Sequence, residues 1–175
     1  HGLPDFLYSL NATLRYKQFD LTLFFNGVAG NDIYNEVDNI INSFDSRGFN
    51  TKLDFYETRW HGEGTSNTTP RATFLDANNN RRTSNRYVEN GSYLRLKNAM
   101  IGYNLPAGWM SRAGFTQARI YASMQNVFTI TKYKGFDPEL YTNDNLANYG
   151  DLGVGIDMGT YPPSRTFTFG VQLTF

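Results

Sequence analysis

Side chains that could perform acid–base or metal chemistry are sparse in this sequence. His61 is the only histidine apart from His1, so a hydrolytic triad or a histidine-rich metal site would have to be built around it. Its neighbours in residues 60–64 are typical of a loop. Cysteine is absent, which removes disulfides, thiol nucleophiles and zinc–thiolate sites. We therefore expect no catalytic residue, no cofactor and no metal site, and we expect that the protein is not an enzyme.

Four aspartates in the second half of the chain offer the oxygen ligands that Ca²⁺ prefers. They are Asp137, Asp144, Asp151 and Asp157. Their spacing does not match the calcium-loop pattern D-x-[DN]-x-[DN]-G. Two interpretations stay open, a Ca²⁺ site in a surface loop and solvated turn residues, and Asp157-Met158-Gly159 favours a turn.

Aromatic side chains are the other chemically distinctive group. They make up 16% of the chain, roughly double the share in a typical soluble domain. Aromatic rings stack on the apolar faces of sugars and anchor protein interfaces. One set is Tyr133, Phe136, Tyr141, Tyr149 and Tyr161. These rings either contact a ligand or a partner, or pack the surrounding loop together.

The end of the chain shows the clearest structural pattern. Its apolar residues are Phe167, Phe169, Val171, Leu173 and Phe175, and the residues between them are threonine, glycine and glutamine. Such alternation gives a β-strand one apolar and one polar face. A soluble sheet rarely ends in this way, because an unprotected edge strand pairs with other chains. In a transmembrane β-barrel the last strand closes on the first, so we predict that Phe175 ends a closing strand.

The same alternation predicts about five strands, near residues 7–16, 19–28, 92–104, 115–130 and 165–175. Lys17-Gln18 joins the first two as a hairpin. Strands of about 10 residues are long enough to cross a bilayer when tilted. In the third strand the apolar phase changes near Lys97-Asn98, which predicts a β-bulge. Arg15, Arg95 and Arg119 fall on the polar face, where they fit a polar lumen or ordinary hydration of its wall.

Long polar loops, residues 29–90 and 131–164, separate the hairpins. Short turns at one end and long loops at the other are typical of an outer-membrane barrel. In the first loop, helical spacing predicts an amphipathic helix with Asn31 or Asp32 as N-cap. Its apolar residues are Ile33, Val37, Ile40, Ile41 and Phe44. In the second loop, Lys132, Lys134 and Arg165 could neutralise Asp137 and Glu139.

Composition limits the alternatives. The net charge is zero, which gives no basic surface for nucleic acid. No apolar run approaches the ~18–20 residues of a membrane helix, and the mean hydropathy is −0.49. The first residues have no signal-peptide features, and about five strands cannot close a bacterial barrel. We therefore expect an all-β, antiparallel transmembrane β-barrel of which residues 1–175 are a C-terminal fragment.

Several segments resemble the carboxy-terminal region of SusC/RagA-type TonB-dependent outer-membrane transporters. They are residues 25–35, 59–60 with 70–72, 91–98, 102–106, 125–139, 155–162 and 165–170. The resemblance implies a plugged barrel of about 22 strands in the outer membrane of a Gram-negative bacterium. It also implies import of nutrients, commonly oligosaccharides and sometimes peptides, with a SusD-like surface lipoprotein as partner. TonB would act through an N-terminal region that this chain lacks.

The resemblance also suggests roles for two groups of residues. The terminal set, Phe167, Phe169, Val171, Leu173 and Phe175, resembles the carboxy-terminal signal read by the barrel-assembly machinery and would face lipid. The loop aromatics defined above are candidates for contacts in the vestibule or with the lipoprotein lid. Two alternatives remain, a soluble β-sandwich carbohydrate-binding module and an outer-membrane enzyme of the lipase or protease type. The second lacks a credible Ser/His/acid set.

Overall fold

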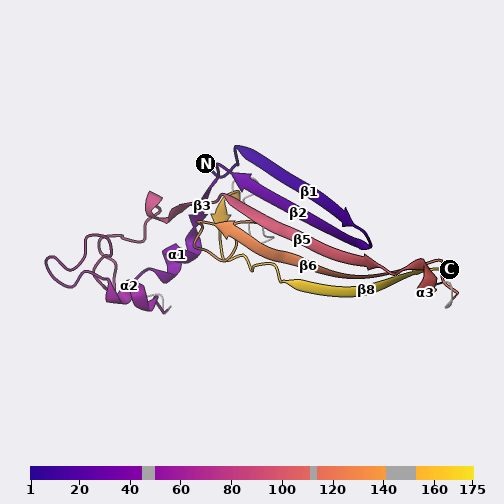
Figure 1. Ribbon diagram of the computed structural model, residues 1–175. Helices are drawn as coiled ribbons and strands as arrows, with labels where there is room; N and C mark the ends of the chain where they lie inside the picture. Colours follow the sequence, from indigo (N-terminus) through magenta and orange to yellow (C-terminus); the bar gives the residue numbers. More distant parts are fainter. Residues whose placement is uncertain (45–49, 111–113, 141–152) are drawn as a thin grey trace.

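The computed structural model describes residues 1–44, 50–110, 114–140 and 153–175. Its main feature is one five-stranded antiparallel sheet in the order β1-β2-β5-β6-β8 (Figure 1). The strands are β1 (Phe6–Tyr16), β2 (Phe19–Ala29), β5 (Tyr93–Asn104), β6 (Gln117–Thr131) and β8 (Thr166–Thr174). The predicted antiparallel sheet of about five strands is thus present. Each strand pairs with the next along the sheet, and the sheet is not closed on itself.

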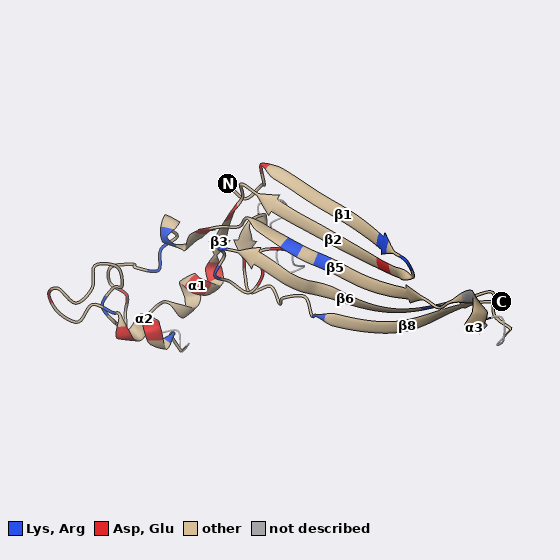
Figure 2. Ribbon diagram, in the orientation of Figure 1, with Lys and Arg blue, Asp and Glu red and all other residues tan. Residues whose placement is uncertain are grey.

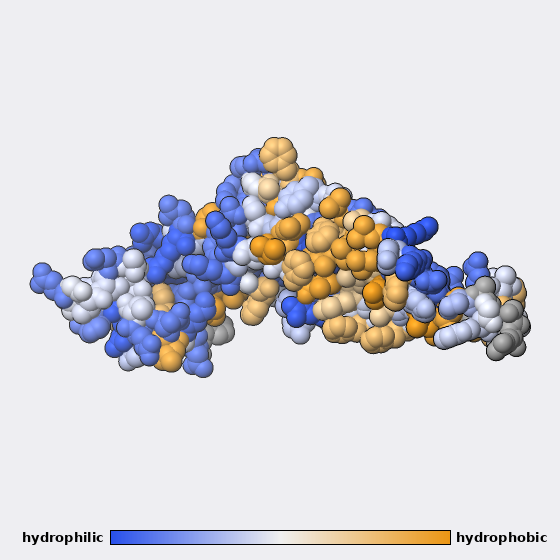
Figure 3. Space-filling model, viewed as in Figure 1, coloured by the Kyte–Doolittle hydropathy of each residue, from blue (hydrophilic) through white to orange (hydrophobic). Residues whose placement is uncertain are grey.

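One face of this sheet is apolar from edge to edge. A single row of paired residues crosses all five strands, from Leu14 through Leu21, Ile101 and Ala122 to Phe169. Leu14 is 61% exposed and Phe169 is 80% exposed, so no second layer covers them. Figure 3 shows apolar side chains gathered over these strands. A β-sandwich would bury this face against another sheet, so the arrangement does not fit that alternative.

The opposite face is polar. The neighbouring row runs from Arg15 through Asp20, Gly102 and Tyr121 to Gly170. Arg119 donates to both carboxylate oxygens of Asp20, from Nε at 3.0 Å and from Nη2 at 2.5 Å. The pair spans β5 because Gly102 has no side chain there, and a Cβ at that position would lie 2.4 Å from Arg119 Nη2.

A β-bulge lies at Lys97, where the change of phase predicts one. On β2, Phe24 pairs with Asn98 whereas the next residue, Phe25, pairs with Leu96. The register between β5 and β6 shifts at the same place. The extra residue returns the two halves of β5 to a common phase, so that its apolar side chains share one face despite the break in the alternation.

Short connections lie at one end of the sheet. Lys17-Gln18 forms the two-residue turn between β1 and β2, and Lys17 has a φ of +54°. A positive φ at the first central residue occurs in the primed hairpin turns, whose backbone twist matches that of the flanking strands. Between β5 and β6 the chain forms the short helix α3 (Ala107–Met110), which starts directly after Pro106, a residue that favours the first turn of a helix.

The long loops at the other end are not structureless. They form a second, three-stranded sheet in the order β4-β3-β7 (Figure 1). Its strands are β3 (Asp32–Asn35), β4 (Val88–Asn90) and β7 (Ile156–Asp157). Helix α1 (Glu36–Ile41), helix α2 (Leu53–Glu57) and the 3₁₀ turn η1 (Asn85–Tyr87) accompany it. Ile33, Phe55 and Tyr87 are buried, which gives the loops an apolar core of their own.

The predicted loop helix is partly wrong. Ile33 is fully buried in a strand, where it pairs with Glu89 of β4. The helix begins later, and its N-cap is Asn35, whose Oδ1 accepts a hydrogen bond from Asp38 N at 2.9 Å. Pairing with a strand more than 50 residues away therefore overrides the helical spacing of the apolar residues.

Candidate functional site

Arg95 is the most buried charged side chain of the described sheet, and it joins the sheet to the second loop. It lies on the polar face of β5 and is 1% exposed. Its Nη2 donates to both oxygens of Asp137 at 2.6 and 2.7 Å, and its Nη1 donates to Glu139 Oε2 at 2.8 Å. Nε donates to Thr129 Oγ1 at 2.8 Å. A buried charge is tolerated when it is paired and hydrogen-bonded in this way.

The partners of these carboxylates differ from the predicted ones. Lys97, at the bulge, donates to Glu139 Oε1 at 2.8 Å and completes the cluster. The expectation that Lys132, Lys134 and Arg165 neutralise Asp137 and Glu139 is therefore wrong. Antiparallel pairing places the end of β6 beside the start of β5, so cations about 40 residues away in sequence are nearer in space.

Tyr133 and Asp157 form a second buried contact between the loop segments. The Tyr133 hydroxyl donates to Asp157 Oδ2, and Asp157 Oδ1 accepts from the backbone N–H groups of Gly159 (2.8 Å) and Thr160 (3.1 Å). Asp157 thus shapes a turn, as the sequence suggests. Burial, helped by the hydrogen bond to Asp157, raises the pKa of the Tyr133 hydroxyl above its ordinary value.

The described members of the candidate aromatic set differ in exposure. Tyr133 is buried, which favours a role in packing the loops together. Phe136 is 67% exposed and Tyr161 is 88% exposed, and both remain available for contacts. Tyr141 and Tyr149 lie outside the described residues, as do Asp144 and Asp151.

The described residues contain no obvious catalytic or metal centre. His61 lies in an exposed loop with its Nδ1 3.0 Å from the carbonyl oxygen of Arg59. No group of three or more His, Asp or Glu residues in the described ranges could hold a metal ion. Across the same ranges, no helix has both the length and the apolar character needed to span a bilayer.

The terminal strand presents the predicted apolar residues outward. Phe167, Phe169, Val171 and Leu173 of β8 are 63%, 80%, 65% and 45% exposed. Phe175 is 87% exposed, and its ring centroid lies 5.2 Å from that of Phe115. In the described part of the chain β8 pairs with β6 alone, so its second edge is open.

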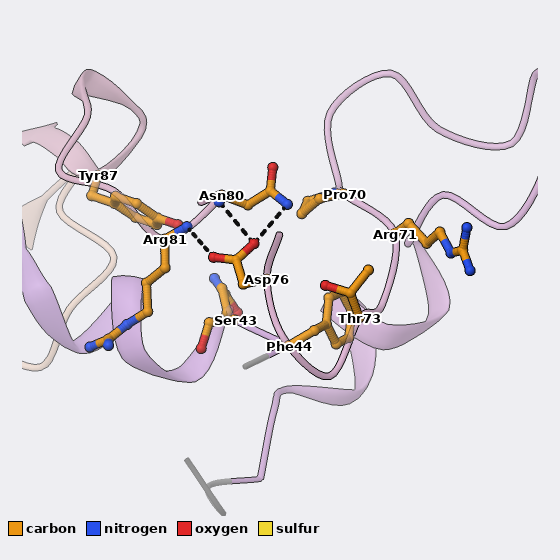
Figure 4. Close-up of a pocket in the computed structure, with 10 residues that line it drawn as sticks. Ser43, Phe44, Pro70, Arg71, Thr73, Asp76, Asn80, Arg81 and Tyr87 are labelled. Carbon is orange, nitrogen blue, oxygen red and sulfur yellow. Dashed lines mark hydrogen bonds between the residues drawn. The ribbon is translucent and has the colours of Figure 1, made fainter. Parts of the chain in front are cut away.

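The first loop holds two adjacent pockets that sequence reasoning missed. In the first, Asp76 accepts hydrogen bonds from the backbone and side chain of Asn80 and from the backbone of Arg81 (Figure 4). That pocket leaves about 10 Å³, room for one water molecule.

The second pocket, which we call the loop pocket, leaves about 570 Å³. Among the residues that line it are Trp60, Asn67, Arg71, Thr73, Asn78 and Arg86. The arginines are the one signal in the sequence that could have drawn attention to it. Most charged residues lie in the loops and towards the strand ends, and the strands are otherwise largely uncharged apart from blue bands within β5 (Figure 2).

Comparison with known proteins gives a consistent result. No family model matches the chain. It is 39% identical over 173 residues to TonB-dependent receptor P3 of Formosa agariphila, a match that covers 98% of this chain and 16% of the relative. It is 29% identical over 174 residues to TonB-dependent receptor SusC of Bacteroides thetaiotaomicron, covering 98% of this chain and 15% of the relative.

Solved structures agree with the sequence relatives. The RagAB peptide importer in its closed-closed state superposes with a TM-score of 0.80 at 25% identity, covering 99% of this chain and 18% of that chain. In the open-open state the TM-score is 0.77. The chain belongs to the SusC/RagA-type TonB-dependent receptors. It spans less than a fifth of the length of these relatives.

Membership of the TonB-dependent receptors confirms the resemblance and the fold class. The five-stranded sheet is a segment of an antiparallel transmembrane β-barrel, and it is not closed in the fragment. The two sheet faces then have the surroundings that their side chains require, lipid for the apolar face and the lumen for the polar face. Relatives bear the names of receptors and importers.

Replacing Arg95 by methionine should destabilise the folded receptor by about 3–5 kcal/mol, because buried Asp137 would lose its cation and Glu139 would keep only Lys97. Urea unfolding of the receptor in micelles measures the change. Lys132→Met removes an exposed cation at the base of the same loop and should leave the midpoint nearly unchanged. Equal midpoint shifts for the two variants would contradict the role of Arg95.

Replacing Tyr133 by phenylalanine should cost about 1–3 kcal/mol, because buried Asp157 would lose a donor. The raised pKa adds a pH dependence. Above pH 10.0, the ordinary value for tyrosine, the unfolded hydroxyl loses its proton while the folded one keeps it, so stability falls as pH rises. Unfolding midpoints at pH 8 and pH 11 should show a smaller alkaline loss for Tyr133→Phe than for wild type. Tyr161→Phe, at an exposed ring, is the matched control and should behave as wild type.

Proposed function

We propose that this chain is the C-terminal part of the barrel wall of an outer-membrane, TonB-dependent nutrient importer of SusC type. The observation that carries the proposal is the uncovered apolar face that crosses all five strands. Lipid is the surrounding in which such a face is stable. The open edges of β1 and β8 pair with further strands of the same barrel, because unpaired backbone groups are costly in a bilayer.

The importer takes up oligosaccharides or peptides and does not act as an enzyme. In support, one structural relative is a peptide importer by name, and one sequence relative is SusC. A SusD-like surface lipoprotein is the partner at the loop end of the barrel, where Phe136 and Tyr161 are exposed. TonB acts through an N-terminal region outside this chain, at the end of the barrel with short turns.

The terminal strand has a second role in this proposal. The residues Phe167, Phe169, Val171, Leu173 and Phe175 form the carboxy-terminal signal that the barrel-assembly machinery reads during insertion. Their uninterrupted outward alternation and the ring contact of Phe175 with Phe115 support it.

The two faces can be tested with adjacent residues of β8. An arginine at Phe169 would point into lipid and should cost about 2–4 kcal/mol, whereas an arginine at Thr168 would point into the lumen and cost little. Each variant of the full-length receptor would be expressed in a strain that lacks its own copy. We expect Phe169→Arg to be depleted from the outer membrane and Thr168→Arg to be retained.

Growth of the same strains on polysaccharide or peptide as sole nutrient tests import. Deletion should abolish growth on at least one such nutrient, and the wild-type gene should restore it. If the Phe169→Arg variant were as abundant in the outer membrane as the wild type, the assignment of the lipid face would be wrong. If the deletion strain grew unchanged on every saccharide and peptide offered, the assignment of import would be wrong.

Replacing Phe175 by aspartate should mainly impair insertion rather than the stability of molecules already inserted, because the residue follows the last paired strand residue. The rate at which newly made receptor becomes resistant to heat and SDS, measured after a radioactive pulse, should fall. Phe175→Tyr keeps the aromatic ring and should insert at the wild-type rate. Normal assembly of the aspartate variant would contradict the signal.

A further inference from the structure

The loop pocket is large enough to hold a ligand and lies away from the strands. Its room of about 570 Å³ falls within the range of known small-molecule pockets, roughly 300–1,000 Å³. Its residues come from two segments of the first loop, 60–73 and 77–86. The neighbouring pocket around Asp76 holds little more than one water molecule, so a ligand in this loop would occupy the loop pocket.

Hydrogen bonds hold the two walls in place. In the first wall, Trp60 N donates to Thr69 O at 3.1 Å, and the Ser66 hydroxyl accepts from Thr69 N at 3.0 Å. In the second, the Asp76 carboxylate holds the 76–81 turn through Asn80 and Arg81 (Figure 4). The pocket is therefore formed before any ligand arrives, which lowers the ordering cost of binding.

The electrostatics of the pocket favour an anion. Arg71 and Arg86 line it, and none of its lining residues is acidic. Arg71 has no ion pair in the described residues, and its side chain points away from Asp76 in Figure 4. The Arg86 guanidinium lies over the rings of Phe55 and Tyr87, at 5.6 and 6.0 Å, rather than against a carboxylate. Both cations can still bind a carboxylate or sulfate.

The remaining lining favours a hydroxyl-rich ring. Asn67, Asn78 and Thr73 offer amide and hydroxyl groups of the kind that bond sugar hydroxyls. Trp60, 39% exposed, offers an aromatic ring for the apolar face of a sugar. Besides Trp60, the apolar residues of the lining are the small Pro70 and Ala77. They offer little apolar surface to anchor the side chains of a peptide.

We propose that the loop pocket binds an anionic saccharide. Arg71 and Arg86 pair with its carboxylate or sulfate groups, and Trp60 stacks on a sugar ring. The saccharide comes either from the medium or from a glycolipid of the same membrane. That this loop faces the outside rests on the proposed function, whereas binding itself does not.

Calorimetric titration of the full-length receptor in detergent tests the site. The test ligands are hexagalacturonate, the neutral sugar maltohexaose and the acidic peptide hexaglutamate. We expect hexagalacturonate to bind most tightly. Arg71→Gln and Arg86→Gln should each weaken it about tenfold or more, the effect of losing one charge-assisted hydrogen bond. Arg86→Lys should retain part of the affinity.

Lys52→Gln is the matched control. Lys52 belongs to the same loop and pairs with Asp38 at 2.9 Å outside the pocket, so its loss removes one positive charge without touching the lining. Its affinity for hexagalacturonate should stay within about twofold of wild type, as expected for a distant exposed charge.

Three results would overturn the proposal. They are equal or absent binding of the two hexasaccharides, tighter binding of hexaglutamate than of hexagalacturonate, and the same loss of affinity for Lys52→Gln as for the pocket arginines. Because binding is measured without transport, a failed growth assay leaves these results intact and a failed titration leaves import intact.

A second arm separates the two sources. Titrations are repeated in phospholipid nanodiscs with and without lipopolysaccharide. Weaker hexagalacturonate binding in the presence of lipopolysaccharide, seen for wild type and not for Arg71→Gln, identifies the glycolipid. Equal binding in both discs identifies a saccharide from the medium. Either result supports the site.

Discussion

The two faces of one sheet must meet opposite surroundings, and most of this structure depends on that constraint. Backbone groups of the five strands are paired along the sheet, so the side chains alone decide what each face can contact. The apolar row that ends at Phe169 and the polar row that ends at Gly170 lie one residue apart. A slip of one residue in any strand would exchange the faces. The bulge at Lys97 is compatible with this constraint because it restores the phase that the sequence breaks.

Polar side chains on the lumen face also connect parts of the structure to one another. Asp20 and Arg119 tie three strands together across Gly102, near the end with short turns. At the loop end, Arg95 ties the second loop to the sheet through Asp137 and Glu139. The barrel wall thus carries a charge pair near each end of the lumen face.

Local patterns revealed the strands, and distant contacts remained hidden from sequence. Alternation is a property of neighbouring residues, so the strands, the hairpin at Lys17 and the bulge were predictable. Ile33 was misassigned to a helix because its partner in β4 lies far along the chain. The expected partners of Asp137, which are Lys132, Lys134 and Arg165, are wrong for the same reason, because strand pairing brings Arg95 to it instead. The burial of Tyr133 and the loop pocket both depend on how the loops pack. Loop packing leaves no periodic pattern of apolar residues in the sequence.

The parallel pairing of β3 with β7 joins the two long loops. Tyr34 of the first loop pairs with Ile156 of the second, and Lys134 N donates to Glu89 across the same junction. One small sheet therefore contains backbone from both loops, and neither can be exchanged without removing a strand from the other. An engineer who transplants ligand preference between receptors of this kind would have to move residues 30–92 and 132–165 as a single cassette.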